Sequence, residues 1–317
     1  MRSRSEPMLA MSRLRALTVV IAVSIVGMTA VPGSAAAPTA QRACTKAGAR
    51  ATIAGTKSVC VRTAKGLVWM PQGNSSGGGS QQGQQLGSAN SITWSPTADG
   101  WRANGTPPVC PAPLVIEPPV DVARATSILY PGQTRGGNYK AHGGFRFDSN
   151  ADNAIAVHAP MAGSVVLGAR YLVSGEVQYT FDIMSPCGIM NRLGHLLVLA
   201  PRMQAIADRF PAPQENDSRT TFVSPPVPVA AGELLATQVG VTRPAPNVFL
   251  DWGVYDYRST NASAASPVWA GQHAQDFALA GHALCWLELL PPQQKARVAT
   301  LPAADPASGR TSDFCRA

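Results

Sequence analysis

Six cysteines limit what this chain can fold into more than any other feature of its sequence. They are Cys44, Cys60, Cys110, Cys187, Cys285 and Cys315, and all follow an apolar N-terminal segment. An even number of cysteines in an exported chain is typical of a disulfide framework, so we expect three disulfides. The absence of a C-x-x-C pair argues against a redox motif and against a thiolate zinc site.

The pairing of these cysteines is only partly set by the sequence. Cys44 and Cys60 enclose one short segment and are expected to pair with each other. The other four allow three pairings, which all stay open. We favour Cys110 with Cys187 and Cys285 with Cys315.

The N-terminus predicts export. Four arginines (Arg2, Arg4, Arg13 and Arg15) precede an apolar run over 16–31, and small residues follow at 34–37. This pattern is typical of a secretory signal peptide, here 1–36, that is removed from the mature chain. The run is short for a membrane span, and an uncleaved anchor is the alternative. We therefore expect a secreted, extracytoplasmic protein of the cell envelope with no stable membrane insertion.

The charge of the chain is mildly basic. The formal net charge is +8, and residues 1–36 hold four Arg and one Glu, so the mature chain carries about +5. Such a charge suits loose attraction to anionic wall polymers or lipid headgroups. No basic stripe is interleaved with aromatic residues, so nucleic acid is not an expected partner.

Composition divides the mature chain into four parts. Residues 41–70 form a small module closed by Cys44 and Cys60, with too few residues to bury a core unaided. Residues 71–108, rich in Gly, Ser, Gln and Pro, are expected to be a flexible linker, with Trp94 and Trp101 docking its second half onto the next domain. Residues 109–290 form the main domain, and 291–317 an irregular tail held by Cys315.

The main domain reads as an antiparallel β-sheet domain with few helices. Apolar or alternating runs rich in β-branched and aromatic residues lie at 155–158, 163–167, 177–183, 196–199 and 248–255, separated by Gly and Pro. Helices are expected at 201–210 and 291–298. The fold class is therefore predicted as mainly β.

Five short motifs follow one another in this domain. They are HGGFRF at 142–147, APMAGSV at 159–165, LGHL at 193–196, PVAAGELL at 228–235 and VFLDWGV at 248–254. In this order they resemble the motifs of the lysostaphin-type zinc endopeptidases, which cut peptidoglycan cross-bridges. The resemblance implies a β-sheet domain of lysostaphin-type peptidase-like architecture.

The same resemblance implies a degenerate metal site. His142 keeps the position of the family's first zinc ligand, but Arg146 stands where its aspartate ligand belongs. Asp251 stands where the last histidine ligand belongs, and Phe249 replaces the other histidine of that motif. His195 keeps the position of a catalytic histidine.

These replacements remove what the family mechanism requires. A catalytic zinc takes three protein ligands and keeps one position open for water. An arginine cannot serve as a ligand, because its guanidinium stays protonated and only donates hydrogen bonds. We therefore expect no cofactor and no hydrolysis, and instead a binding groove lined by His142, Arg146, His195, Phe249 and Asp251.

The expected function is thus non-catalytic: the chain binds peptidoglycan or regulates an envelope hydrolase. The alternative is an active zinc-dependent cell-wall endopeptidase with displaced ligands. A third reading is a structural envelope protein whose groove is filled by its own tail. No other catalytic motif stands out in the sequence.

Two hypotheses concern the charges of the site. Because an unpaired buried charge costs several kcal/mol, we expect Arg146 and Asp251 to form an ion pair at the former zinc position, with His142 beside it. If the register is shifted by two residues, Asp148 joins His142 and Asp251 in a carboxylate-rich site suited to a harder cation.

The remaining histidines and several tyrosines have plainer interpretations. His158, His273 and His282 lie outside the positions with a role in the family and are expected to be structural. Tyr139, Tyr255 and Tyr257 could line the groove, but aromatic residues near strand ends are more often core or rim residues.

Overall fold

The computed structural model describes residues 44–46, 48–53, 56–63, 66–71, 92–148 and 150–316. The predicted signal peptide and residues 72–91 of the predicted linker lie outside them. Cys44–Cys60, Cys110–Cys187 and Cys285–Cys315 are disulfide-bonded, which confirms the favoured pairing. Such bonds favour a location outside the cytoplasm. Among the described residues, no helix is both long and apolar enough to cross a bilayer.

The small N-terminal module is a three-stranded antiparallel sheet. Its strands are β1 (Arg50–Ile53), β2 (Thr56–Thr63) and β3 (Gly66–Pro71), in that order. The Cys44–Cys60 disulfide ties the segment before β1 to the middle of β2. A covalent bond compensates for a core that so few residues cannot build.

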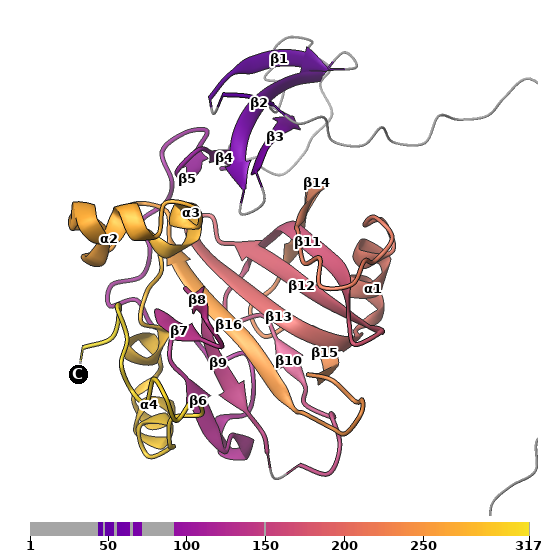
Figure 1. Ribbon diagram of the computed structural model, residues 1–317, viewed down its shortest axis with the longest axis vertical. Helices are drawn as coiled ribbons and strands as arrows, with labels where there is room; N and C mark the ends of the chain where they lie inside the picture. The colour runs from indigo at the N-terminus through magenta and orange to yellow at the C-terminus, as the bar shows by residue number, and fades with distance from the viewer. Residues whose placement is uncertain are drawn as a thin grey trace, which may run out of the picture. The chain divides into compact units, whose positions relative to one another are not determined.

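The main domain is built on a nine-stranded sheet in which every paired strand is antiparallel, and the mainly β prediction is confirmed (Figure 1). Its strands are β6 (Ser127–Leu129), β9 (Gly143–Arg146), β10 (Val157–His158), β11 (Gly163–Val173), β12 (Glu176–Met184), β13 (Ile189–Leu199), β14 (Thr221–Val229), β15 (Leu234–Val239) and β16 (Phe249–Asp256). The order is β14-β11-β12-β13-β16-β9-β6, and β15 pairs with β13 and β10.

Alternation along β16 separates the two faces of this sheet. Leu250, Trp252 and Val254 enter the main hydrophobic core, where Trp252 packs against Phe145 and Trp286. Residues 249, 251, 253 and 255 point to the other face, because successive side chains of a strand alternate. Tyr255 lies in a second, smaller core at one end of that face. Asp251 lies nearer the other end of the strand, where the candidate site is found.

The helices are short and most begin with proline. They are α1 (Pro201–Ala207), α2 (Pro267–Gln272), α3 (Phe277–Ala280) and α4 (Pro292–Ala299), with 3-10 turns at Val122–Arg124, Ser263–Ala265 and Trp286–Leu289. The predicted helices near 201–210 and 291–298 are present as α1 and α4. The sequence pattern missed α2 and α3, because helices of six and four residues carry no detectable periodicity.

The second half of the predicted linker is part of the main domain. It forms the hairpin β4 (Trp94–Thr97) and β5 (Gly100–Ala103). Trp94 Nε1 donates to the carbonyl of Pro186 at 3.1 Å, and the Trp101 ring lies 6.4 Å from that of Tyr257. The predicted docking of both tryptophans is therefore observed. Two aromatic anchors offset the ordering entropy of a polar segment.

The C-terminal tail runs beside β6 and the hairpin β7 (Gln133–Arg135) and β8 (Asn138–Lys140). The backbone of Ile128 exchanges hydrogen bonds with Pro302 and Ala304. Gln133 Nε2 donates to the carbonyls of Gly309 and Thr311. After α4, the described part of the tail has no helix or strand, as predicted, and these contacts together with the Cys285–Cys315 bond hold it in place.

Candidate functional site

Three adjacent strands bring the predicted site residues together. Asp251 of β16 lies opposite Gly194 of β13 on one side and Gly144 of β9 on the other. A side chain at 144 is excluded, since its Cβ would lie 2.1 Å from the carbonyl oxygen of Leu250. The two glycines therefore leave room above the sheet for the side chains of His142 and His195.

Both histidines contact the same carboxylate. Nε2 of His142 lies 3.0 Å from Oδ2 of Asp251, and Nε2 of His195 lies 3.4 Å from the same oxygen. The side chains of His142, His195 and Asp251 keep 23%, 22% and 19% of their surface exposed, so a ligand can reach them. We call these three residues the His–Asp–His cluster.

The cluster stabilises the charged form of its carboxylate. Burial by itself raises the pKa of Asp251, because desolvation disfavours the anion. Attraction to His142 and His195 and hydrogen bonds from both rings outweigh that effect, and they hold the pKa of Asp251 well below its ordinary value.

His195 reaches the cluster from an unusual backbone conformation. Its φ is +59°, in the left-handed region that non-glycine residues rarely adopt. It lies at an irregularity in the pairing of β12 with β13, where residues 193 and 196 pair with 181 and 179. The carbonyl of His195 accepts a hydrogen bond of 2.8 Å from the amide of Gly240. Backbone strain of this kind costs about 1–3 kcal/mol and is common at functional sites.

A buried glutamine holds the imidazole of His195 from behind. Oε1 of Gln178 lies 2.5 Å from Nδ1 of His195, and Nε2 of Gln178 donates to the carbonyl of Gly240 at 2.8 Å. A carbonyl can only accept, so the amide NH2 of Gln178 must face Gly240. Oε1 then faces the ring, and Nδ1 of His195 must carry a hydrogen.

Arg146 does not pair with Asp251, so that hypothesis was wrong. Its Nε and Nη2 donate to Oδ1 of Asp148 at 2.9 and 2.7 Å, and Nη2 also donates to Asn247 at 2.8 Å. The reason is register: Arg146 lies opposite Phe249, while Gly144 lies opposite Asp251. From that position the guanidinium binds the nearer carboxylate.

The alternative site with Asp148 as a ligand is not formed either. Oδ2 of Asp148 accepts from the hydroxyl of Thr126 at 3.0 Å, while its Oδ1 binds Arg146. Burial raises the pKa of Asp148, but the bonds to Arg146, Thr126 and Ser127 lower it further, and the net shift is downward. Asp148 is therefore the ion-pair partner of Arg146 and not a member of the His–Asp–His cluster.

Phe249 supplies the apolar part of the site. Its ring centroid lies 4.4 Å from that of His195, and the guanidinium carbon of Arg146 lies 6.0 Å from its centroid. All five residues predicted for the groove therefore lie in one neighbourhood of the sheet.

Sequence reasoning missed three residues that support the site: Gln178, Arg135 and Asn247. Arg135 Nη2 donates to the carbonyl of His142 at 3.1 Å and thereby fixes its backbone. Gln178 carried a usable signal, since Gln178, Thr180 and Asp182 place polar side chains on one face of a strand. Arg135 and Asn247 stand in loop-like sequence, which carried no signal for their role.

The other singled-out residues lie away from the cluster. His282 bonds to the carbonyls of Asp256, Ser259 and Asp99, and His273 packs between Tyr139 and Trp269. The backbone of His158 pairs in β10. The hydroxyl of Tyr139 donates to Asp313 at 2.9 Å, while Tyr255 and Tyr257 are buried in the second core.

Metal binding has limited support in the part of the chain that the structure describes. No group of three or more His, Cys, Asp or Glu side chains there is arranged to hold a metal ion. In the His–Asp–His cluster, both imidazoles approach the same carboxylate oxygen, Oδ2 of Asp251. That oxygen therefore acts as a hydrogen-bond acceptor.

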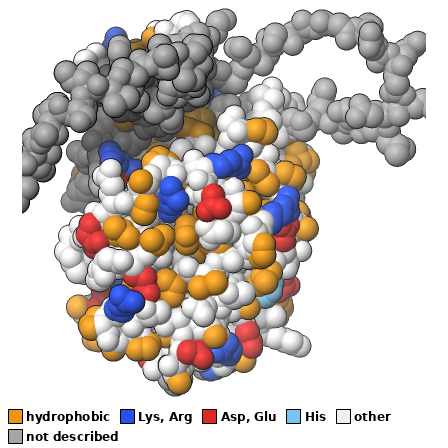
Figure 2. Space-filling view, turned by 90° about the vertical axis from the view of Figure 1, so that its right-hand side faces the viewer, with side chains coloured by type: hydrophobic (Ala, Val, Ile, Leu, Met, Phe, Trp, Pro, Cys, Tyr) orange, Lys and Arg blue, Asp and Glu red, His pale blue; other side chains and the backbone are white. Residues whose placement is uncertain are grey.

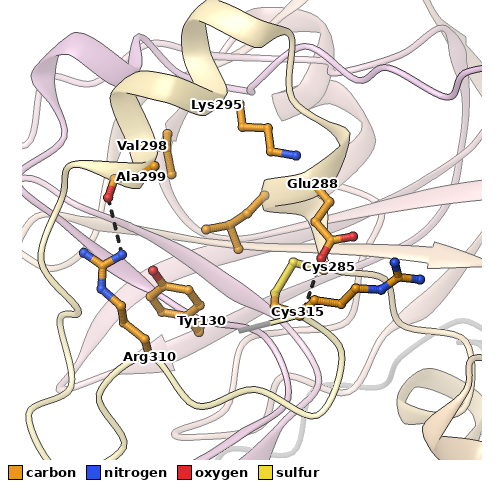
Figure 3. Close-up of a pocket in the computed structure, with 10 residues that line it drawn as sticks. Tyr130, Cys285, Glu288, Lys295, Val298, Ala299, Arg310 and Cys315 are labelled. Carbon is orange, nitrogen blue, oxygen red and sulfur yellow. Dashed lines mark hydrogen bonds between the residues drawn. A yellow bond between two sulfur atoms is a disulfide. The ribbon is translucent and has the colours of Figure 1, made fainter.

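A separate cavity of about 170 Å³ lies around the Cys285–Cys315 disulfide (Figure 3). The charged residues among those that line it are Glu288, Lys295, Arg310 and Arg316. Two of these side chains hold the C-terminal tail in place. Arg310 donates to the carbonyls of Ala299 and Leu301, and Glu288 accepts a hydrogen bond from the backbone amide of Arg316. None of the predicted site residues lines this cavity.

Charge is not concentrated on the face of the molecule shown in Figure 2. Lys and Arg side chains there alternate with Asp and Glu among hydrophobic side chains. No family model matches the chain, and comparisons with curated proteins and with solved structures found no match either. The resemblance to the lysostaphin-type endopeptidases therefore rests on the five sequence motifs.

Proposed function

We propose that this chain is an exported, non-catalytic protein of the cell envelope that binds peptidoglycan through the His–Asp–His cluster. One observation carries the proposal: the charged groups that stand at the family's zinc-site positions are satisfied by neighbouring side chains. Asp251 is bonded by His142 and His195, and Arg146 is bonded by Asp148. They form a partly exposed polar surface beside the ring of Phe249.

The chemistry of hydrolysis supports the non-catalytic reading. Water activation in the family needs a metal with three protein ligands and an open position. Here Arg146 takes the place of the aspartate ligand in the motif, and a guanidinium cannot coordinate a metal. Phe249 has no hydrogen-bonding group with which to stabilise a developing charge.

The composition of the site suits a wall peptide. Imidazole, carboxylate and guanidinium groups offer donors and acceptors, and Phe249 offers apolar contact; most ligand sites combine these features. The three disulfides favour an extracytoplasmic location, where peptidoglycan is found.

Sedimentation with purified sacculi tests the proposal. We expect the full chain to co-sediment, and Asp251→Asn and His195→Ala to weaken binding about tenfold, because each removes one hydrogen-bonding partner of a charged group. Asp152→Asn, on an exposed loop, is the matched control. Failure of the unsubstituted chain to sediment would contradict wall binding, and pull-down of an envelope hydrolase would then favour the regulatory role.

The second candidate is a zinc-dependent endopeptidase whose ligands are displaced. The observation in its favour is that Nε2 of His142 and Nε2 of His195 lie 3.0 and 3.4 Å from one carboxylate oxygen of Asp251. Ligands about 2.0–2.2 Å from one zinc ion have similar mutual spacing. If zinc binds, these three residues hold it, and it would supply water activation.

Elemental analysis separates the two candidates. The protein is purified without chelator, its zinc content is measured, and release of soluble fragments from sacculi is followed with added zinc. We expect substoichiometric zinc and no release. One zinc per chain together with fragment release would establish the endopeptidase instead.

A further inference from the structure

The cavity around the Cys285–Cys315 disulfide has an apolar wall. Leu287, Val298 and the disulfide itself line it, and Val298 belongs to the main hydrophobic core. Its volume is about 170 Å³. An engineered cavity of about 150 Å³ in another protein holds benzene, so this one has room for a group of about six non-hydrogen atoms.

A buried hydroxyl in this cavity has no partner among the described residues. Tyr130 is 7% exposed and lines the cavity. Its carbonyl accepts a hydrogen bond from Arg135, whereas no residue that the structure describes bonds to its hydroxyl. Buried polar groups are nearly always hydrogen-bonded. The hydroxyl therefore marks a place where a bound molecule can supply the missing partner.

The charged residues of the lining favour an anion. Lys295, Arg310 and Arg316 carry three positive charges against the one negative charge of Glu288. Figure 3 shows Lys295 and Glu288 across the cavity from Arg310 and Tyr130. The guanidinium of Arg310 already donates to two backbone carbonyls. Within the described ranges, the side chains of Lys295 and Arg316 have no hydrogen-bond or ion-pair partner, so two cations are available to a ligand.

A carboxylate on a small apolar group matches this combination. Its oxygens accept hydrogen bonds from the hydroxyl of Tyr130 and from the cations of Lys295 and Arg316. Hydrogen bonds between ionised groups are the stronger kind. The apolar part of such a ligand lies against Leu287 and Val298. A metal ion is disfavoured, because the cations of the lining repel it.

We propose that this cavity binds the carboxylate of a small apolar acid, either free or as the last residue of a peptide, through Tyr130, Lys295 and Arg316. An acid the size of propionate or alanine fills the volume. The cavity shares no residue with the His–Asp–His cluster. The inference therefore goes beyond the proposed function, and either of the two can fail without the other.

Two pairs of matched ligands test the inference by NMR titration of the full chain. N-acetyl-alanine is compared with its amide, and propionate with propionamide; each pair differs in charge and hardly in size. We expect the acids to bind about tenfold more tightly than their amides, because they gain a hydrogen bond between charged groups. The acid that binds more tightly identifies a peptide terminus or a free acid as the source. Equal affinities within both pairs, or no binding of either acid, would overturn the proposal.

Substitutions with opposite expected signs locate the binding site. Tyr130→Phe removes only the hydroxyl and Arg316→Gln removes one cation, and each should weaken the acids about threefold. Glu288→Gln should strengthen their binding, since it removes a competing anion and keeps an oxygen for the amide of Arg316. Arg209→Gln, at an exposed arginine outside the lining, is the matched control. Equal effects of Arg316→Gln and Glu288→Gln would contradict a direct role of charge.

The His–Asp–His cluster is the other place where an acid could bind, and one comparison excludes it. Lys295→Gln should weaken the acids about threefold while leaving their amides unchanged. If the preference for the acids is lost in Asp251→Asn but kept in Lys295→Gln, the carboxylate binds at the cluster and the inference is wrong. Co-sedimentation with sacculi is measured on the same variants, so that wall binding and acid binding are judged separately.

Discussion

At the scale of single residues, the candidate site is centred on Asp251. Its carboxylate contacts the imidazoles of His142 and His195. The residues opposite it on the two adjacent strands, Gly194 and Gly144, are both glycines. Small residues on either side let two long side chains lie over the strand. One acidic residue thereby organises groups from three strands.

A pH dependence follows from the depressed pKa of Asp251. The unfolded state titrates near an ordinary aspartate value of about 3.9, and the folded state titrates lower because of His142 and His195. The stability contributed by Asp251 is therefore present above the unfolded pKa and lost as the pH falls through the folded pKa.

Replacing Asp251 by Asn should remove this contribution. We expect the free energy of unfolding at pH 7 to fall by about 1.5–3 kcal/mol, the value of hydrogen bonds to a charged group. Its decline below pH 4 should become shallower. Urea denaturation at pH 7 and pH 3 measures both, with Asp152→Asn as the control. An unchanged acid slope would show that the cluster is not ionised as described.

Position 144 has no room for a side chain, which is why it suits glycine. Gly144→Ala places a Cβ 2.1 Å from the carbonyl oxygen of Leu250, next to Asp251. We expect a loss of about 1–3 kcal/mol through overpacking, together with weaker ligand binding. Gly271→Ala, where no atom lies within 4 Å, is the control. Thermal unfolding of both variants checks the difference, and equal stabilities would be inconsistent with the β9–β16 register.

At the scale of elements, an ion pair with a buried carboxylate joins β12 to β13. Asp182 and Arg192 are cross-strand partners, and the guanidinium donates to both carboxylate oxygens at 2.7 and 2.6 Å. The side chain of Asp182 is completely buried. These two strands also carry Gln178 and His195, so their alignment matters for the site.

Removing one partner of that pair should be costly. Asp182→Asn leaves a partly buried guanidinium, 22% exposed, without its counter-charge, and we expect a loss of about 3 kcal/mol, the lower end for a buried pair. The matched control is Glu233→Gln, whose partner Arg202 is 50% exposed; exposed pairs contribute about 1 kcal/mol or less. Chemical denaturation compares the two variants. Similar losses would mean that Asp182 is more hydrated than its burial indicates.

At the scale of the whole molecule, disulfides join parts that are distant in the sequence. Cys110–Cys187 spans 77 residues and ties the segment before the sheet to the β12–β13 turn. Cys285–Cys315 spans 30 residues and holds the C-terminal tail. Both constrain the unfolded chain.

Loss of either disulfide should destabilise the protein by similar amounts. Loop-closure entropy predicts about 3.5–4.5 kcal/mol for each, with the longer loop worth roughly 0.8 kcal/mol more, since the dependence on length is logarithmic. Denaturation of the Cys110→Ser/Cys187→Ser and Cys285→Ser/Cys315→Ser proteins measures this. A much larger loss for the second pair would show that packing of the tail, rather than chain entropy, dominates.

The sequence by itself determined the properties that depend on composition and short-range pattern. The cysteine count predicted three disulfides, and runs rich in β-branched and aromatic residues predicted strands in β11, β12 and β16. The motifs also indicated the five residues expected to line the groove. The strand runs and the motifs each lie within about ten residues of chain, where sterics and alternation act, whereas the cysteine count is a property of the whole chain.

Only the tertiary structure decided which of those side chains meet. Asp251 bonds to His142 and His195 rather than to Arg146, because the register of β9 against β16 places Arg146 opposite Phe249. Gln178 joins the site because an irregularity in β13 turns His195 towards it. Register and backbone irregularities depend on pairing between distant strands, and a shift of one residue would exchange the faces, so local patterns cannot specify them.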